Sequence, residues 1–389
     1  MDRDKSPVMG AKQRICFVVS SALTIRAFLC SHIAALSETF DVSVVANAAP
    51  GTFAAETLPA ELFSVPIERR ISLLRDLRAL VYLVGIFSRS RFNVVHSVTP
   101  KAGLLAMTAA YFARVPVRIH IFTGQVWATR RGPARVMLRA IDRLIASLAT
   151  HVLVDSHSQR EFLIANRVVA PAKSAVLAEG SICGVDVGRF RPDGTARRRV
   201  RAALAVPDEA VLFLYLGRLS RDKGVVDLAR AFAALAKRHA SAHLLVVGPD
   251  EEGLMQRVEA LRAGCRERFH RFDFTDRPEE CMAAADVFCL PSYREGFGQV
   301  AVEASAAELP VIASRIYGVT DAVVEGETGL LHAPGDVEAL TERMRTLIEH
   351  PEMRRSLGSA GRARVVRAFS AERVTRALLD YYSVVTGRL

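Results

Sequence analysis

The chain has 389 residues, of which 50% are hydrophobic and 24% are charged. It is too long for one ordinary domain and apolar enough for two cores, so we expect two α/β domains of roughly 180 residues each. The six cysteines are scattered without a Cys-x-x-Cys pair or metal-type spacing, which excludes a disulfide framework and favours a reducing compartment. No stretch approaches the ~20 apolar residues of a spanning helix. We therefore expect a cytoplasmic protein, at most peripheral on the inner face of the membrane.

The positive charge is concentrated in the first half. The net charge is +11, and residues 1–190 contain 23 Lys and Arg against 13 Asp and Glu, whereas residues 191–389 contain 29 against 28. A basic region of this size attracts an anionic surface or ligand. The sequence has no basic–aromatic interleaving and no nucleic-acid module, so nucleic acid is not expected as a partner. An anionic membrane surface or a phosphorylated acceptor fits better.

The first half alternates short apolar runs with amphipathic stretches. Its first apolar run resembles the core of a secretory signal, but Asp2 and Asp4 precede it and Arg26 follows it, so we expect a buried strand instead. The expected strands are 15–19, 42–46, 93–97, 117–122 and 151–155, and the expected helices are 27–36, 73–88, 99–111, 133–148 and 158–165. A glycine-containing stretch at 180–190, with a run of charges after Arg197, then indicates a domain boundary.

The second half restarts the same alternation. The expected strands are 211–216, 243–248, 269–272, 286–290 and 311–314; the expected helices are 225–238, 252–263, 278–285, 336–349, 351–367 and 370–384, with a hairpin-like turn at 326–329. Alternation of this length predicts a parallel sheet covered on both faces in each half, that is, two doubly wound α/β domains. Such sheets bind ligands in the loops beyond the carboxyl ends of their strands.

The stretch from Pro291 to Glu303 is the most informative of the chain. It follows a buried strand, breaks at Gly296 and Gly298 and continues as a helix of small residues. Two glycines at the start of a helix let backbone amides approach an anion, which the helix N-terminus also favours. Glu295 and Glu303 cannot bind phosphate, and we interpret them as ligands of hydroxyl groups. This combination predicts a nucleotide-sugar site; the alternative is an ordinary strand–loop–helix with two solvated glutamates.

This stretch resembles the donor-binding signature of the retaining glycosyltransferases of family 4, the glycosyltransferase group 1 family. That signature has two glutamates separated by seven residues, within a segment like PSxxEGFGxxxxEAMAxGxP. The resemblance implies the glycosyltransferase B fold, in which two Rossmann-like domains face a cleft. It implies an acceptor-binding domain over 1–188 and a nucleotide-sugar domain over 189–369, with a C-terminal helix at about 370–389 packing back on the first domain.

The resemblance also implies roles for individual residues of the donor site. Glu295 would hold the hydroxyls of the donor sugar, and Glu303 those of the ribose. Asp273, in a segment that borders the base in the family, stands where glycine is common, and Glu308 stands where relatives mostly have Gly. Asp321 matches an acidic position more weakly and equally suits a surface turn. The other implied donor-binding residues are Gly217, Thr275, Gly296, Phe297, Gly298, Gln299 and Val300.

Two cations flank the loop that follows the strand at 211–216. Arg218 and Lys223 belong to the segment Gly-Arg-Leu-Ser-Arg-Asp-Lys-Gly, which matches the phosphate clamp of the family. A diphosphate leaving group gains charge as its bond to the sugar breaks, and two fixed cations stabilise that transition state without a metal. Two cations in a loop are otherwise an ordinary solvated turn. With Glu295, these residues form the catalytic set that the resemblance implies.

Three segments of the first half resemble the subgroup of the family that builds bacterial surface polysaccharides: 96–103, 124–127 and 180–186. Relatives often place a His directly before the glycine at 124, where this chain has Thr. We interpret His120, three residues earlier, as a packed strand residue. His96 stands near the end of its strand, where it could equally well face the cleft or pack inside the domain. The acceptor-binding residues implied are His96, Lys101, Thr123 and Gly124.

Arginines recur at spacings of four after the single tryptophan, Trp127. The row contains Arg131, Arg135, Arg139 and Arg143 and would follow one side of a helix. Such a row is usually a solvated face. Together with the charge excess of this half, it favours contact with anionic lipid headgroups or a lipid diphosphate.

The implied reaction is the transfer of a sugar, with retention of its anomeric configuration, from a UDP-sugar to a lipid-linked or saccharide acceptor. The subgroup suggests an N-acetylated hexose. No metal and no other cofactor is expected, because no Asp-x-Asp follows any of the expected strands. A nucleotide-sugar epimerase of the same fold and a non-catalytic sugar-nucleotide-binding subunit are the alternatives. A dinucleotide-dependent oxidoreductase is not expected, since residues 19–24 lack the Gly-x-Gly-x-x-Gly that would follow its first strand.

Overall fold

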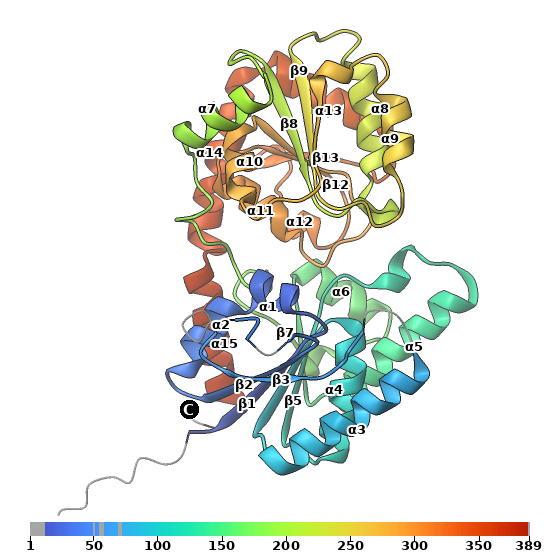
Figure 1. The fold of residues 1–389 in the computed structure, drawn as a ribbon, viewed down its shortest axis with the longest axis vertical. Coiled ribbons are helices and arrows are strands. Elements are labelled where there is room, and N and C mark those ends of the chain that lie inside the picture. Colours follow the sequence, from blue (N-terminus) through green and yellow to red (C-terminus); the bar gives the residue numbers. More distant parts are fainter. Residues whose placement is uncertain (1–11, 50, 54–57, 69–71, 388–389) are drawn as a thin grey trace, which may run out of the picture.

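In the computed structural model, the described residues are 12–49, 51–53, 58–68 and 72–387. They form two domains, one above the other in Figure 1, and each domain is built on one parallel sheet. The first sheet has the strand order β3-β2-β1-β4-β5-β6-β7 and the second β10-β9-β8-β11-β12-β13. Both are therefore doubly wound, with the order reversing beside the first strand of each half. The predicted fold class, two doubly wound Rossmann-like α/β domains, is confirmed.

The first sheet consists of short, mostly buried apolar strands. They are β1 (Arg14–Val18), β2 (Asp41–Ala46), β3 (Glu61–Ser64), β4 (Val94–Val98), β5 (Val117–Phe122), β6 (His151–Val154) and β7 (Ser174–Val176). Helices α3 (Leu73–Ser90), α4 (Pro100–Phe112) and α5 (Gly132–Leu148) cover one face. Helices α1 (Ala22–Phe28) and α2 (Cys30–Ser37) cover the other, and α6 (His157–Ala165) follows β6. Burial on both faces explains why the strands are apolar runs without alternation.

The second sheet repeats this plan. Its strands are β8 (Val211–Leu216), β9 (Ala242–Val247), β10 (Phe269–Phe272), β11 (Val287–Leu290), β12 (Val311–Ser314) and β13 (Gly329–His332). One face carries α7 (Gly194–Ala203), α10 (Pro278–Ala284), α11 (Gln299–Ala306) and α14 (Pro351–Ala368). The other carries α8 (Val225–Leu235), α9 (Met255–Leu261) and α13 (Val337–Glu349), while α12 (Val319–Ala322) follows β12.

The chain passes between the halves twice, and the two passages lie side by side. The amide of Val185 donates to the carbonyl of Phe369 at 2.8 Å, and the amide of Ala371 donates back to Val185 at 2.8 Å. The last helix, α15 (Ala371–Val385), then packs against α2 of the first half. Its buried side chains are bound there by hydrogen bonds, one of which joins Tyr382 to His96 at 2.8 Å.

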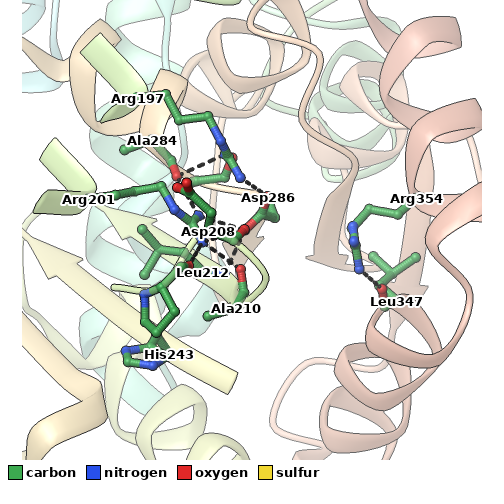
Figure 2. Close-up of polar contacts among 12 residues, drawn as sticks. Arg197, Arg201, Asp208, Ala210, Leu212, His243, Ala284, Asp286, Leu347 and Arg354 are labelled. Atoms are coloured by element: carbon green, nitrogen blue, oxygen red, sulfur yellow. Dashed lines mark hydrogen bonds and ion pairs between the residues drawn. The ribbon is translucent and has the colours of Figure 1, made fainter. Parts of the chain in front are cut away.

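A buried arginine network fixes α7 to the second sheet (Figure 2). The side chain of Arg201 is 1% exposed and pairs with Asp286 at 3.1 Å, and Arg197 pairs with the same carboxylate at 2.8 Å. The Oδ2 of Asp286 that pairs with Arg201 also accepts the amide of Leu212 in β8 at 2.7 Å. Removing one partner of a buried ion pair is costly, so this network is a structural element. The charged run after Arg197, taken as part of a boundary, is in fact a docked helix.

The structure differs from the expected elements at the sheet edges. The strands β3 and β7 and the helix α7 were not predicted, and the helix expected at 27–36 is divided into α1 and α2. The turn at 326–329 leads into β13, which pairs in parallel with β12 and does not form a hairpin. Among the described residues, no helix is both long and apolar enough to cross a membrane.

Candidate functional site

The carboxyl edges of the two sheets face each other, and their loops are in direct contact. The guanidinium of Arg294 donates to the carbonyl of Gly124 at 3.0 Å, and the hydroxyl of Ser156 donates to the carbonyl of Gly296 at 3.0 Å. Ligands of doubly wound sheets bind at this edge. The residues predicted from the sequence in the second half therefore lie opposite the predicted acceptor edge of the first.

The loop with the two cations is pressed onto the loop that contains Glu295. Gly224 has φ +69°, and a Cβ there would lie 2.0 Å from the carbonyl oxygen of Pro291, so only glycine allows this approach. The amide of Tyr293 donates to the carbonyl of Asp222 at 2.8 Å, and Arg294 pairs with the carboxylate of Asp222 at 3.1 Å. These contacts hold the short helix η3 (Arg221–Lys223) beside Glu295.

Lys223 and Glu295 form the central pair of the site. Their Nζ and Oε1 atoms are 2.5 Å apart, and the two side chains are 22% and 13% exposed. The hydroxyl of Ser292 donates to the same Oε1 at 2.8 Å. The pair is thus partly shielded from water, where an attraction between charges is stronger than on an open surface.

Arg218 lies on the same loop but points to a different carboxylate. Its guanidinium pairs with Glu251 at 2.6 Å, and the phenol of Tyr215 donates to its backbone carbonyl at 2.8 Å. Glu251 follows β9, and its proximity to Arg218 was not predicted from the sequence. Each cation of the predicted clamp therefore has its own carboxylate partner.

The helix α11 begins at the glycine-rich end of the 291–303 stretch. Gly298, with φ +89°, is its N-cap, so the first amides of the helix are directed at the loop. The side-chain amide of Gln299 donates to Gly184 at 2.7 Å and approaches Glu303 at 3.4 Å. Burial raises the pKa of Glu303 to about 7. The side-chain amide of Gln299 thus links Glu303 to the interdomain passage, since its oxygen accepts the hydroxyl of Ser181 at 2.7 Å.

The other predicted donor residues have varied surroundings. The side chain of Phe297 is buried and packs on Phe369 with ring centroids 5.1 Å apart, so only its backbone faces the site. Val300 is half-buried. The hydroxyl of Thr275 accepts the amide of Arg277 at 3.0 Å, and Asp273 is exposed and pairs with Arg271. Gly217 lies under the ring of Tyr215.

Gly296 lies where the two halves meet. A Cβ on Gly296 would be 2.5 Å from Oδ2 of Asp155 and 2.7 Å from the amide nitrogen of Gly124. The backbone of Thr123 lies beside it, and the carbonyl of Thr123 accepts the side-chain amide of Gln159 at 2.7 Å. Thr123 and Gly124, predicted as acceptor residues, thus contact the donor loop through their backbones.

Asp155 is a buried acid that the sequence analysis did not single out. Its Oδ1 has no hydrogen-bond partner among the described residues, and burial raises its pKa to about 8. It follows β6 at the carboxyl edge of the first sheet. An acidic residue after a buried parallel strand is the signal that would have identified it.

Two of the predicted acceptor residues lie away from this contact. His96 is buried in the first sheet and hydrogen-bonded to Tyr382, and burial lowers its pKa to about 3. Lys101 pairs with Asp76 of α3 at 2.6 Å. His120 is fully buried and bonded to Ser97 at 2.8 Å, which confirms that it is a packed strand residue.

Two further contacts join the halves. The carboxylate of Asp321 accepts the amide and the hydroxyl of Ser158 at the start of α6, so it is not a free surface turn. The ring of Tyr317 stacks on Phe162 at 4.4 Å, and Phe162 stacks on Trp127 at 5.1 Å. The indole nitrogen of Trp127 donates to the buried Asp142 at 2.7 Å.

Comparison with known proteins gives the family of the chain. Residues 196–364 match the family described as glycosyl transferases group 1, and residues 25–180 match the glycosyl transferase 4-like domain. The capsular polysaccharide biosynthesis glycosyltransferase CapM of Staphylococcus aureus is 30% identical over 320 residues, which are 82% of this chain and 84% of CapM. The chain is a group 1 glycosyltransferase.

Other relatives of this glycosyltransferase agree with that assignment. The putative glycosyltransferase EpsD of Bacillus subtilis is 28% identical over 83% of this chain and 84% of its own. Among solved structures, Anabaena Alr3699/HepE in complex with UDP superposes with a TM-score of 0.77 at 22% identity, over 96% of this glycosyltransferase and 100% of that chain. WaaG, a glycosyltransferase involved in lipopolysaccharide biosynthesis, has a TM-score of 0.73 at 19% identity, over 93% and 98%. At these identities the structural likeness concerns the fold.

Proposed function

We propose that this glycosyltransferase moves a sugar, an N-acetylated hexose, from a UDP-sugar to a lipid-linked or saccharide acceptor, with retention of configuration, in the synthesis of a cell-surface polysaccharide. The observation that carries the proposal is the pair of Lys223 and Glu295 at the edge of the second sheet, directly opposite the first domain. This pair places a cation that can bind the diphosphate next to a carboxylate that can bind the sugar. The capsular polysaccharide biosynthesis glycosyltransferase CapM supports the polysaccharide, and HepE, solved in complex with UDP, supports the nucleotide.

In the proposed reaction, Arg218 and Lys223 exchange their carboxylate partners for the diphosphate of the donor. The bond between the anomeric carbon and the diphosphate oxygen breaks, and both cations stabilise the negative charge that the leaving group gains. The acceptor hydroxyl attacks on the face that the diphosphate leaves and gives its proton to a diphosphate oxygen. Glu295 holds the sugar hydroxyls, and Glu303 those of the ribose. The two cations supply the charge that this chemistry needs without a metal.

The acceptor is proposed to bind at the edge of the first domain, beside Thr123 and Gly124. Their backbones contact the donor loop, so an acceptor in this position lies next to the anomeric carbon. Lys101 belongs to the same proposal as a more distant acceptor contact, whereas the burial of His96 under α15 excludes it from direct contact with the acceptor. We place the reaction at the inner face of the cytoplasmic membrane, where a lipid-linked acceptor is available.

A panel of nucleotide sugars tests this function. We expect UDP-sugars to raise the melting temperature and to be consumed in the presence of a lipid-linked oligosaccharide, with the anomeric configuration of the product retained by NMR. Lys223→Ala should lower transfer by about 10²–10³-fold, the loss found when one charge-stabilising group of an active site is removed. The exposed Lys237, which follows α8, offers the control Lys237→Ala, which should leave transfer unchanged.

The same panel distinguishes the two alternatives. An epimerase would convert a UDP-sugar into an isomer in the absence of any acceptor. A non-catalytic subunit would be stabilised by UDP-sugars but would transfer nothing, and Lys223→Ala would change binding alone. Either result would overturn the proposal.

A further inference from the structure

An unpaired carboxyl oxygen lies at the contact between the two domains. It belongs to Asp155, which directly follows β6 and is 4% exposed. Its Oδ1 is buried and forms no hydrogen bond with any described residue. Buried polar atoms are almost always paired in folded proteins, so an unpaired one at the ligand-binding edge of a parallel sheet indicates a group that a ligand completes.

The backbone of Asp155 is fixed on both sides. Its amide donates to the side-chain oxygen of Gln159 at 2.8 Å, and its carbonyl accepts the amide of Ser181 at 2.7 Å. Gln159 also donates from its side-chain amide to the carbonyl of Thr123 at 2.7 Å. These bonds connect the end of β6, the passage between the domains and the loop after β5. The carboxyl group is therefore held in one place, as a ligand-binding group must be.

Two glycines bring the loop of residues 291–298 against this carboxyl group. A Cβ on Gly296 would lie 2.5 Å from Oδ2 of Asp155, so the carboxyl group faces the backbone of Gly296. The same Cβ would lie 2.7 Å from the amide nitrogen of Gly124, and a Cβ on Gly124 would lie 2.9 Å from the amide nitrogen of Gly296. Neither amide donates a hydrogen bond to another described residue. Two unpaired amides and an unpaired carboxyl oxygen thus lie close together.

A hydroxyl group matches this combination of groups. It accepts hydrogen bonds from amides and donates one to a carboxyl oxygen. Burial raises the pKa of Asp155 to about 8, so at neutral pH the carboxyl group is protonated and can both donate and accept, as a hydroxyl does. An anion would suit the amides alone, and a cation would suit the carboxyl group alone. A neutral hydroxyl suits both.

The position of these groups indicates a hydroxyl of the transferred sugar. Glu295, the proposed ligand of the sugar hydroxyls, directly precedes Gly296, and consecutive Cα atoms are about 3.8 Å apart. Lys223, the proposed ligand of the diphosphate, pairs with Glu295 at 2.5 Å. Both residues belong to the second domain, whereas Asp155 reaches the proposed sugar site from the first.

We propose that Asp155, together with the amides of Gly124 and Gly296, binds one hydroxyl of the transferred sugar and thereby selects the donor. This inference rests on the proposed UDP-sugar donor. The backbones of the two glycines are in contact in this structure, so the sugar enters as the two loops move apart. A site built to bond a hydroxyl discriminates against an analogue that lacks it, since the buried polar groups of the site are then left unpaired.

Calorimetric titration with UDP, UDP-N-acetylglucosamine and its 3-, 4- and 6-deoxy analogues tests the inference without any acceptor. We expect one deoxy analogue to bind about ten-fold or more weakly than UDP-N-acetylglucosamine. In Asp155→Leu, which keeps the approximate shape of the side chain without its polar atoms, this ratio should shrink by about five-fold, the share of one hydrogen bond. Asp155→Asn, whose amide also donates and accepts, should retain most of the ratio. The affinity for UDP itself should be the same in all three proteins.

Ser158→Ala is the matched control. It removes a hydrogen bond between the domains, to the carboxylate of Asp321, but no group beside Gly296. It should bind UDP-N-acetylglucosamine and the deoxy analogues in the same ratio as the natural protein. Melting temperatures establish that each variant is folded, and the smaller substitution Asp155→Ala replaces Asp155→Leu if leucine prevents folding.

A ratio that neither Asp155→Leu nor Asp155→Ala changes would overturn the inference, because Asp155 would then bond only to water or to the chain itself. Equal binding of all three deoxy analogues and the parent by the natural protein would do the same. So would an equal loss of UDP affinity in the Asp155 variants, since the defect would lie in the shape of the site. Binding of UDP with no contribution from the sugar would refute the proposed donor as well, whereas transfer from UDP-N-acetylglucosamine with an unchanged ratio would refute this inference alone.

Discussion

The ammonium of Lys223 lies 2.5 Å from Oε1 of Glu295, so the proposed phosphate ligand and the proposed sugar ligand neutralise each other when no donor is bound. A diphosphate must displace Glu295 from Lys223 before the lysine can bind it. The attraction between Lys223 and Glu295 therefore opposes donor binding. This cost is offset when the hydroxyls of the donor sugar bind Glu295 in place of Lys223.

We predict that Glu295→Gln binds UDP more tightly but transfers sugar more slowly. Removing the carboxylate removes both the competitor for Lys223 and a negative charge close to the diphosphate, so the Kd of UDP should fall by about two- to ten-fold, the range expected for one ion pair near the surface. The kcat with a UDP-sugar should fall at least ten-fold, because the sugar hydroxyls lose their acceptor. Calorimetric titration and initial rates measure the two effects. Weaker UDP binding by the variant would contradict the role of the pair.

The contact at Gly296 predicts the effect of a single methyl group. Gly296→Ala places a Cβ 2.5 Å from Asp155 and 2.7 Å from Gly124, so the two domains cannot meet as they do here. Transfer should fall by about 10²-fold, the loss that accompanies a misplacement of about 1 Å between reacting groups. UDP binding should change less than transfer, because the added methyl clashes with the first domain and leaves the backbone amide of Gly296 in place. Gly264→Ala, where an added methyl meets no atom within 4 Å, is the control and should be fully active.

Asp155 predicts a pH dependence of stability. Its ordinary pKa of 3.8 is raised to about 8 by burial, so between these values the folded protein holds a proton that the unfolded chain has released. The contribution of Asp155 to the free energy of unfolding therefore falls as the pH rises from about 4 to about 8 and is constant above that range. Asp155→Asn cannot titrate, and at pH 8 it should be more stable than the natural protein by about 1 kcal/mol or more. Thermal melts at pH 5 and pH 8 measure the difference. A variant that is less stable at both values would indicate that Asp155 is charged and paired.

The stack of Tyr317 on Phe162 predicts two different outcomes at one position. Tyr317→Phe should leave transfer nearly unchanged, because it keeps the ring that stacks on Phe162. Tyr317→Ala removes the ring that joins the second domain to the first, and such aromatic pairs contribute about 0.5–1.5 kcal/mol beyond their buried area. We expect a three- to ten-fold loss of transfer for the alanine variant, measured with saturating donor. Equal activity of the two variants would show that the stack does not hold the domains together.

Strands buried on both faces were predictable from the sequence because their composition reflects that burial. The strands β5 and β8 have the predicted bounds, 117–122 and 211–216. The edge strands β3 and β7 are short and only partly buried, so they lack the apolar run that identifies the others. Lys223 and Glu295 were predicted because their segments resemble the phosphate clamp and the donor-binding signature of the family.

Contacts between segments that are distant in sequence could not be predicted from local sequence patterns. Nothing in the local sequence places Glu251 beside Arg218 or Asp321 at the start of α6, since both contacts depend on how loops from separate strands meet. His96 was expected near the end of its strand, at the edge where ligands bind, yet it lies in the middle of β4 and is covered by α15. Local patterns identify the residues that could form a site, whereas the packing of the domains determines which of them are exposed in it.

The stack across the domains includes Trp127, and this is the only tryptophan of the chain. Its indole is buried against Phe162, which in turn touches Tyr317 of the other domain. Separation of the domains would expose one end of this stack to solvent and alter the surroundings of the single indole. The natural protein thus carries a built-in fluorescent reporter of domain opening, which can be followed in real time without any label.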